Sequence, residues 1–192
     1  MRWGRMLQLG DLRSQTPPAL AILREKVEGL FEQLHLPVFR YVMCKTRNSE
    51  KAEDITQESF LRLFCHLRDE RPVENPKAWL FAVAHNLAVD SMRREGQFKS
   101  LDEGAWNQLE YSRSIAQSDH ERTVLERERR GLLRKAVMSL TPLQQECLHL
   151  RAEGLRLREI ADLLKISIST VADATRRASV KLARQFSTEV SR

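Results

Sequence analysis

The chain has 192 residues, of which 42% are hydrophobic and 30% are charged. These fractions exclude a chain that is disordered throughout, and the length corresponds to one large domain or two of ~100 residues each. Lys and Arg number 32 against 26 Asp and Glu, which gives a formal net charge of +6. This excess of basic side chains favours contact with nucleic acid over contact with acidic protein surfaces.

The sequence contains no signal for membrane insertion or for a metal site. No run approaches the ~18 consecutive apolar residues that a membrane span needs, and we interpret residues 1–17 as a flexible leader. Cys44, Cys65 and Cys147 form no CxxC motif and no Cys/His pair at metal-ligand spacing. We therefore predict small buried cysteines in a reducing cytoplasm, without cofactor or metal.

The N-terminal part of the chain is predicted to contain four helices. Apolar residues recur there at steps of three and four, and acidic residues open the third helix. Asn75 and Pro76 provide an N-cap and a first helical position for the fourth helix, in which Trp79 and Phe81 are interpreted as core residues. The apolar stripes fall in residues 20–34, 38–43, 55–67 and 78–94.

Residues 96–118 lack this periodicity and are interpreted as a linker between domains 18–95 and 119–192. Ser118 with Glu121, and Thr141 with Gln144, have the spacing of capping boxes, so they predict two further helix starts. Gly154 is placed to end the second of these helices. The fold class predicted is all-α, with two small helical domains joined by a flexible linker.

Residues 155–186 have the spacing of a helix-turn-helix, in which the second helix enters the major groove of DNA. A plain helical hairpin is the alternative that spacing alone leaves open. Residues 131–192 carry 11 basic and 6 acidic side chains, which favours DNA as the ligand. The side chains available for phosphates or base edges are Ser169, Thr170, Arg176, Arg177, Lys181 and Arg184.

Four segments of the sequence carry a resemblance to a known family. They are DITQESFLRLF (54–64), NPKAWLFAVAHNLAVDSMRR (75–94), SLDE (100–103) and SLTPLQQECLHLRAEGLRLREIADLLKISISTVADATRRASVKLAR (139–184). In this order they resemble a bacterial RNA polymerase sigma factor of the extracytoplasmic-function (ECF) type, in the sigma-70 family. The resemblance covers about residues 24–186 and implies a four-helix N-terminal domain and a C-terminal helix-turn-helix domain that bind core RNA polymerase.

The resemblance also implies a role for each segment. The helix over 54–64 would dock on the largest polymerase subunit, with Asp54, Gln57, Glu58 and Arg62 on its outer side. The loop 68–76 and Asn86 would read an unpaired base of the minus-ten element, and Arg93 and Arg94 would meet backbone phosphates. The linker would thread toward the RNA exit channel. The helix over 168–184 would lie at the minus-thirty-five element, and an anti-sigma protein would hold the factor inactive.

The recognition helix departs from the family pattern. Ala172, Asp173 and Ala174 stand where family members usually carry a basic or polar triplet, and Lys165 fills a turn position where Gly is common. Asp173 lies near the helix start, which suits the helix dipole, but it also puts a negative charge close to the path of the phosphates. It could instead accept a hydrogen bond from a cytosine amino group.

No catalytic constellation and no small-molecule substrate site is evident, because the five histidines are scattered and no HExxH, GxSxG, Walker or GxGxxG motif occurs. We therefore expect an initiation factor without catalysis of its own. Two other interpretations remain: a self-sufficient helix-turn-helix regulator with an N-terminal sensing or dimerisation bundle, and a protein-interaction scaffold.

Overall fold

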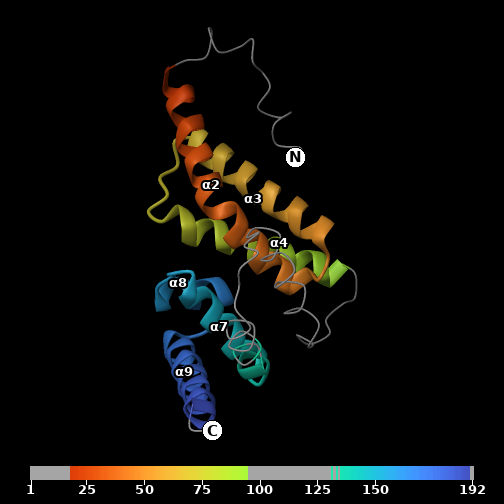
Figure 1. Ribbon diagram of the computed structural model, residues 1–192. Coiled ribbons are helices and arrows are strands. Elements are labelled where there is room, and N and C mark those ends of the chain that lie inside the picture. The colour runs from red at the N-terminus through yellow and green to blue at the C-terminus, as the bar shows by residue number, and fades with distance from the viewer. Residues whose placement is uncertain (1–17, 95–130, 132, 134, 191–192) are drawn as a thin grey trace.

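The computed structural model describes residues 18–94, 131, 133 and 135–190. In these ranges every regular element is a helix, and Figure 1 shows two groups: α2, α3 and α4 form the N-terminal half, and α7, α8 and α9 form the C-terminal half. The all-helical, two-part fold class is confirmed. The helices are α2 (Pro18–Thr46), α3 (Ser49–Arg68), α4 (Pro76–Arg94), α7 (Pro142–Ala152), α8 (Leu157–Leu164) and α9 (Ile168–Val190).

Three of the sequence predictions fall on residues that this description omits. They are the leader over residues 1–17, the linker over 96–118 with the SLDE segment, and the helix start at Ser118. Among the described residues, no helix combines the length and the apolar character needed to cross a membrane.

The first two predicted helices are one continuous helix, α2, with Pro37 in its interior. The two apolar stripes predicted two helices, and a proline inside a helix removes a backbone hydrogen bond and typically costs ~3 kcal/mol. Burial overrides this cost, because Leu34 before the proline and Val38, Tyr41 and Val42 after it all pack into the same core. The number of helices predicted for this half is therefore one too high among the described residues.

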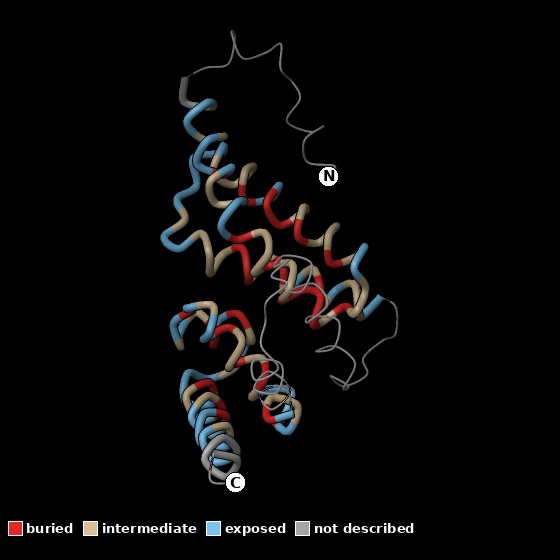
Figure 2. Tube along the Cα trace, viewed as in Figure 1, coloured by how far each residue is buried: buried red, intermediate tan, exposed pale blue. Residues whose placement is uncertain are grey.

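Helices α3 and α4 complete the N-terminal half. Asn48 caps α3 by accepting a hydrogen bond from the Lys51 amide at 3.0 Å, and α3 then buries Phe60 and Leu63 completely. Phe81 of α4 is fully buried, and Trp79 is partly buried against the core, as predicted. Figure 2 shows the buried side of each helix turned toward its neighbours and the exposed side outward.

Local signals in the C-terminal half act as predicted. Thr141 and Gln144 form the capping box of α7, and Gly154 ends the turn after α7 with φ of 89°. Lys165, between α8 and α9, has φ 58° and ψ 42°, a left-handed conformation that costs a residue with a Cβ ~1 kcal/mol or more. Inward-facing residues include Ile160, Ala161, Val171, Ala174 and Ala178, together with Leu163, which sequence reasoning did not assign.

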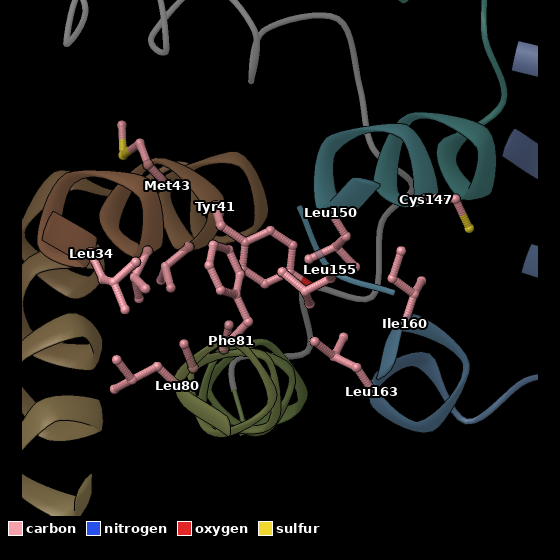
Figure 3. Packing of buried hydrophobic residues seen from close by; sticks show 14 of the residues in the cluster. Leu34, Tyr41, Met43, Leu80, Phe81, Cys147, Leu150, Leu155, Ile160 and Leu163 are labelled. Carbon is pink, nitrogen blue, oxygen red and sulfur yellow. The ribbon is translucent and has the colours of Figure 1, made fainter. Parts of the chain in front are cut away.

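One continuous hydrophobic core joins the two halves. Figure 3 shows Tyr41 of α2 and Phe81 of α4 pointing toward Leu150, Leu155 and Leu163 of the C-terminal half. Burial of large apolar side chains stabilises a contact by ~1.5–3 kcal/mol each, so this shared core strongly favours the packed arrangement. The two halves thus share one core in this structure, a contact that the spacing of residues in the sequence does not indicate.

Candidate functional site

The predicted polymerase-docking residues lie together on the outer side of α3. Asp54 and Arg62 are exposed, and Gln57 and Glu58 are half-buried. Arg62 donates from Nε to Glu58 Oε1 at 2.8 Å, and both side chains remain open to solvent. Leu61 adds an apolar side chain that is 39% exposed. This surface therefore presents charged, amide and apolar side chains to a partner. A partner can contact them without moving the core residues beneath the helix.

The predicted minus-ten residues lie along α4 rather than in one cluster. The Asn75 side chain caps α4, accepting from the Lys77 amide at 3.1 Å and the Ala78 amide at 3.3 Å. Asn86 is exposed and stands eleven residues further along, which places it on the same face but ~16 Å away at ~1.5 Å per residue. Arg93 and Arg94 are exposed at the end of the helix, where Arg93 lies 3.9 Å from Asp90.

The predicted minus-thirty-five residues lie at the start and along the outer side of α9. Ser167 caps the helix by accepting from the Thr170 amide at 3.1 Å, and its hydroxyl also contacts those of Ser169 at 2.7 Å and Thr170 at 2.8 Å. The cap thereby fixes both predicted hydroxyls at the helix start.

The charged residues of α9 differ in their environment. Asp173 pairs with Arg176 at 3.1 Å, so the acid neutralises part of the neighbouring basic charge. Arg177 is exposed, whereas the Lys181 ammonium donates to the Ser139 carbonyl oxygen. Ala172 is half-buried and Ala174 is buried, so two of the three residues that depart from the family pattern contribute to packing.

A largely buried polar cluster between the halves was not predicted. Glu146 of α7 lies 2.5 Å from the Lys45 ammonium and accepts a hydrogen bond from the Tyr41 hydroxyl at 2.8 Å. Because the one phenol proton goes to Glu146, the His85 Nδ1–H is the donor to the Tyr41 oxygen at 2.7 Å, and the same N–H also faces Glu146 Oε1 at 3.4 Å. The His149 ring packs on Tyr41 with centroids 5.6 Å apart. These partners are up to 108 residues apart, so no spacing in the sequence indicates them.

The cluster strongly perturbs the titration of its members. Burial by itself would raise the pKa of Glu146, but the hydrogen bond from His85 and the charge of Lys45 outweigh it and lower the pKa to about 2. Burial lowers the pKa of His149 and raises that of Tyr41 well above its ordinary value. Glu146 is thus a carboxylate held ionised inside the protein by its partners.

Chemically, the described surfaces suit the binding of macromolecules. Among residues 18–94 and 135–190, no group of three or more His, Cys, Asp or Glu side chains is arranged to hold a metal ion. Burial raises the pKa of Cys44 to about 12 and that of Cys147 to about 11, so neither thiol is activated as a nucleophile.

Two family models match the chain. Residues 30–98 match "Sigma-70 region 2" and residues 130–182 match "Sigma-70, region 4", in the order in which the two halves are built. Together these ranges cover more than half of the sequence. The chain belongs to the sigma-70 family and is an RNA polymerase sigma factor of the ECF type, a class of non-enzymatic initiation factors that direct transcription from promoters.

Curated relatives agree with this assignment, and a solved structure shares the fold. The RNA polymerase sigma factor YlaC of Bacillus subtilis is 25% identical over 167 residues, which cover 83% of this chain and 91% of that protein. The ECF RNA polymerase sigma factor BldN of Streptomyces coelicolor is 30% identical over 185 residues, 94% of this chain and 65% of its own length. The sigma factor RpoE of Bartonella quintana, solved with the anti-sigma factor NepR, shares the fold with a TM-score of 0.53 at 21% identity, over 83% of this chain and 98% of that chain.

Proposed function

We propose that this sigma factor docks on core RNA polymerase chiefly through the outer side of α3 and reads its promoter with α4 and α9. The observation that carries the docking role is that Asp54, Gln57, Glu58 and Arg62 are gathered on one accessible helix face above a fully packed core. Partner-binding surfaces require such accessible groups on a rigid element.

The promoter contacts follow from the exposed side chains of the other two helices. Asn86 has both a donor and an acceptor with which to hydrogen-bond the pairing edge of an unpaired minus-ten base, and Arg93 and Arg94 supply charge for phosphates beside it. On α9, Arg176 and Arg177 contact phosphates at the minus-thirty-five element, with Ser169 and Thr170 at the helix start. Asp173 acts there by orienting or neutralising Arg176.

The docking role is tested by transcription with purified core polymerase and the full chain. The variant Gln57→Lys with Glu58→Lys should weaken core binding with little change in melting temperature, because both side chains lie outside the core. Its control is Glu32→Lys with Gln33→Lys, the same charge change on exposed positions of α2. Equal core affinity of the two double variants would contradict the assignment of α3.

The minus-ten role is tested on two templates. Asn86→Ala should reduce open-complex formation on a duplex promoter more than binding to a template in which the minus-ten region is already unpaired and its key base absent. An equal loss on both templates would make Asn86 a structural residue.

We also propose the setting of this activity. The chain acts in the cytoplasm, where polymerase and promoter DNA are, catalyses no reaction itself, and is regulated by an anti-sigma protein, as its family membership supports. Purification of the factor from uninduced native cells without any stoichiometric small protein would contradict the last point.

A further inference from the structure

The Gln57 side chain, on the outer side of α3, is held by a contact within the protein. Its amide nitrogen Nε2 donates a hydrogen bond to Glu53 Oε1 at 3.1 Å, one turn earlier on the same helix. A carboxylate only accepts hydrogen bonds, so the nitrogen of the amide, and not its oxygen, faces Glu53. The Gln57 carbonyl oxygen is on the other side of the planar amide group and therefore turns away from Glu53.

Glu53 is in turn held from the neighbouring helix. Helices α2 and α3 pack side by side (Figure 1), and His35 of α2 places its ring nitrogen Nε2 3.4 Å from the same Glu53 oxygen. Because the carboxylate is the acceptor, Nε2 carries the proton in this contact. One oxygen of Glu53 thus faces two N–H groups, one from each helix.

Aromatic packing anchors the His35 ring. The ring contacts Phe31, with centroids 4.6 Å apart, and stacks on Phe39, with centroids 6.3 Å apart. Phe31 packs edge-on against the fully buried Phe60 of α3, with centroids 4.9 Å apart. Aromatic pairs favour these separations and the tilted, offset or edge-to-face geometry. The contacts therefore run without interruption from the core to the ring that faces Glu53.

The other polar pair of this surface is attached differently. Arg62 and Glu58 pair along α3, and their side chains are 51% and 43% exposed. Such a pair contributes little in water, so either side chain can leave it for a partner at small cost. Gln57 is half-buried, and its amide is fixed before any partner arrives. A partner that binds this amide then has little conformational entropy to remove from it.

We propose that Glu53, supported by His35, is a positioning residue for polymerase docking, because it holds the Gln57 carbonyl oxygen outward toward a hydrogen-bond donor of the polymerase. The inference rests on the proposed docking role of the outer side of α3. Glu53 acts through Gln57 and need not touch the polymerase itself. Removal of the Glu53 carboxylate should therefore matter only while the Gln57 amide is present.

A double-mutant cycle on the full chain tests this dependence. Glu53→Met removes the acceptor at nearly constant length, Gln57→Ala removes the positioned amide, and the double variant removes both. Glu25→Met is the control, because it removes the same charge from an exposed position of α2. Biolayer interferometry measures the affinity of each protein for purified core polymerase, and thermal unfolding checks that each is folded.

Glu53→Met should weaken core binding about fivefold relative to the control, the loss expected when one long side chain has to be ordered on binding. In the Gln57→Ala background the same substitution should change the affinity by less than about twofold, because coupled residues give non-additive losses. Independent losses that multiply in the double variant would overturn the positioning role. An unchanged affinity of Glu53→Met would overturn it as well.

A conservative variant separates the hydrogen bond from the charge. In Glu53→Gln the side-chain carbonyl can still accept from Gln57 Nε2, so core affinity should stay within about twofold of the control although the charge is gone. A loss as large as that of Glu53→Met would show that the charge matters in place of the hydrogen bond, and would overturn the proposal.

The support from His35 has its own variant. His35→Phe keeps an aromatic ring against Phe31 and Phe39 but has no N–H to donate. It should weaken core binding about threefold in the wild-type background and leave it unchanged in the Gln57→Ala background. Equal affinity of His35→Phe and the wild-type chain would overturn the supporting role of His35.

The same cycle separates this inference from the function on which it rests. If Gln57→Ala binds core polymerase as tightly as the wild-type chain, the docking role of Gln57 is wrong. If Gln57→Ala weakens binding and Glu53→Met does not, the docking role stands and the positioning role is wrong.

Discussion

The outer side of α3 and the contact between the halves both contain ion pairs, but they differ in their exposure to water. The Arg62–Glu58 pair has side chains 51% and 43% exposed, while those of Lys45 and Glu146 are 11% and 15% exposed. Water screens the first pair, so its two residues can change partners at little cost. The second pair is out of water, where an ion that loses its partner is strongly destabilising. The same residue chemistry therefore suits a binding surface in one place and a fixed contact in the other.

The largest effect is expected from removing one cation from each pair. Lys45→Met should lower the free energy of unfolding by about 3 kcal/mol, because it leaves Glu146 buried with fewer partners. Arg62→Met should lower it by less than about 1 kcal/mol. Urea unfolding of the full-length variants measures both. Similar losses in the two variants would show that Tyr41 and His85 suffice to hold Glu146 ionised.

The contact between the halves also contains two groups that should make stability respond to acid. His149 is neutral when buried and its pKa is lowered from 6.5, so the unfolded chain binds a proton first and stability falls as the pH drops below about 6.5. The pKa of Glu146 is lowered from 4.5 to about 2, so its contribution is complete above about pH 4.5 and is lost as the pH falls toward 2. The ionisable groups that act on these two residues are Arg40, Lys45, His85 and Glu153.

Urea unfolding at pH 7, 6 and 5 should therefore show a loss of up to about 2 kcal/mol, since one proton contributes ~1.4 kcal/mol per pH unit. In the variant His149→Leu the free energy of unfolding should stay nearly constant from pH 7 to pH 5. It should still decline below pH 4.5. Identical slopes in both proteins would assign the acid response to other groups.

Two N-cap asparagines make the comparison finer. Asn48 caps α3 through the Lys51 amide, whereas Asn75 caps α4 and in addition donates to Glu159. Aspartate is as good an N-cap as asparagine, but it has no proton to donate to a carboxylate. Asn75→Asp should lower the free energy of unfolding, measured by urea unfolding, by about 1 kcal/mol, while Asn48→Asp should change it by less than about 0.5 kcal/mol. Equal stability losses in the two variants would show that the hydrogen bond from Asn75 to Glu159 does not stabilise the contact between the halves.

The smallest effect on stability is expected on α9. Arg176→Ala breaks an exposed pair with Asp173 and should change the free energy of unfolding by less than about 0.5 kcal/mol. In polymerase-bound protein it should weaken binding to all minus-thirty-five sequences and reduce the salt slope by about 1 if Arg176 contacts a phosphate. An unchanged salt slope would show that Arg176 contacts no phosphate, and the phosphate contact would then be assigned to Arg177.

The sequence predicts best those features that neighbouring residues decide. The caps at Asn75 and Thr141, the turn at Gly154 and the left-handed Lys165 follow from side chains and backbone within four residues. The same local signals divide α2 into two helices over 20–34 and 38–43, because the core contacts that keep α2 continuous through Pro37 come from other helices.

The candidate site likewise has one part that local sequence predicts and one part that it does not. The outer side of α3 follows from helical periodicity, whereas the contact between Tyr41 and Glu146 joins residues 105 apart. His85 shows the difficulty: in the sequence it is one histidine on an amphipathic helix, and only its neighbours in space reveal that it helps to keep a carboxylate ionised. Helical periodicity predicts which face of a helix points inward, but it does not predict which residues of other helices pack against that face.

The three cysteines differ in burial, so their rates of chemical modification report on how tightly the core around them is packed. Alkylating reagents attack thiolates, and Cys44 and Cys147 are buried and protonated at neutral pH, while Cys65 on α3 is half-exposed. Modification of Cys65 should thus be fast, and that of Cys44 should proceed only as often as the region around Tyr41 loosens. Mass spectrometry of the unaltered protein, incubated with and without core polymerase, would then show whether polymerase changes the packing around Tyr41, without any introduced label.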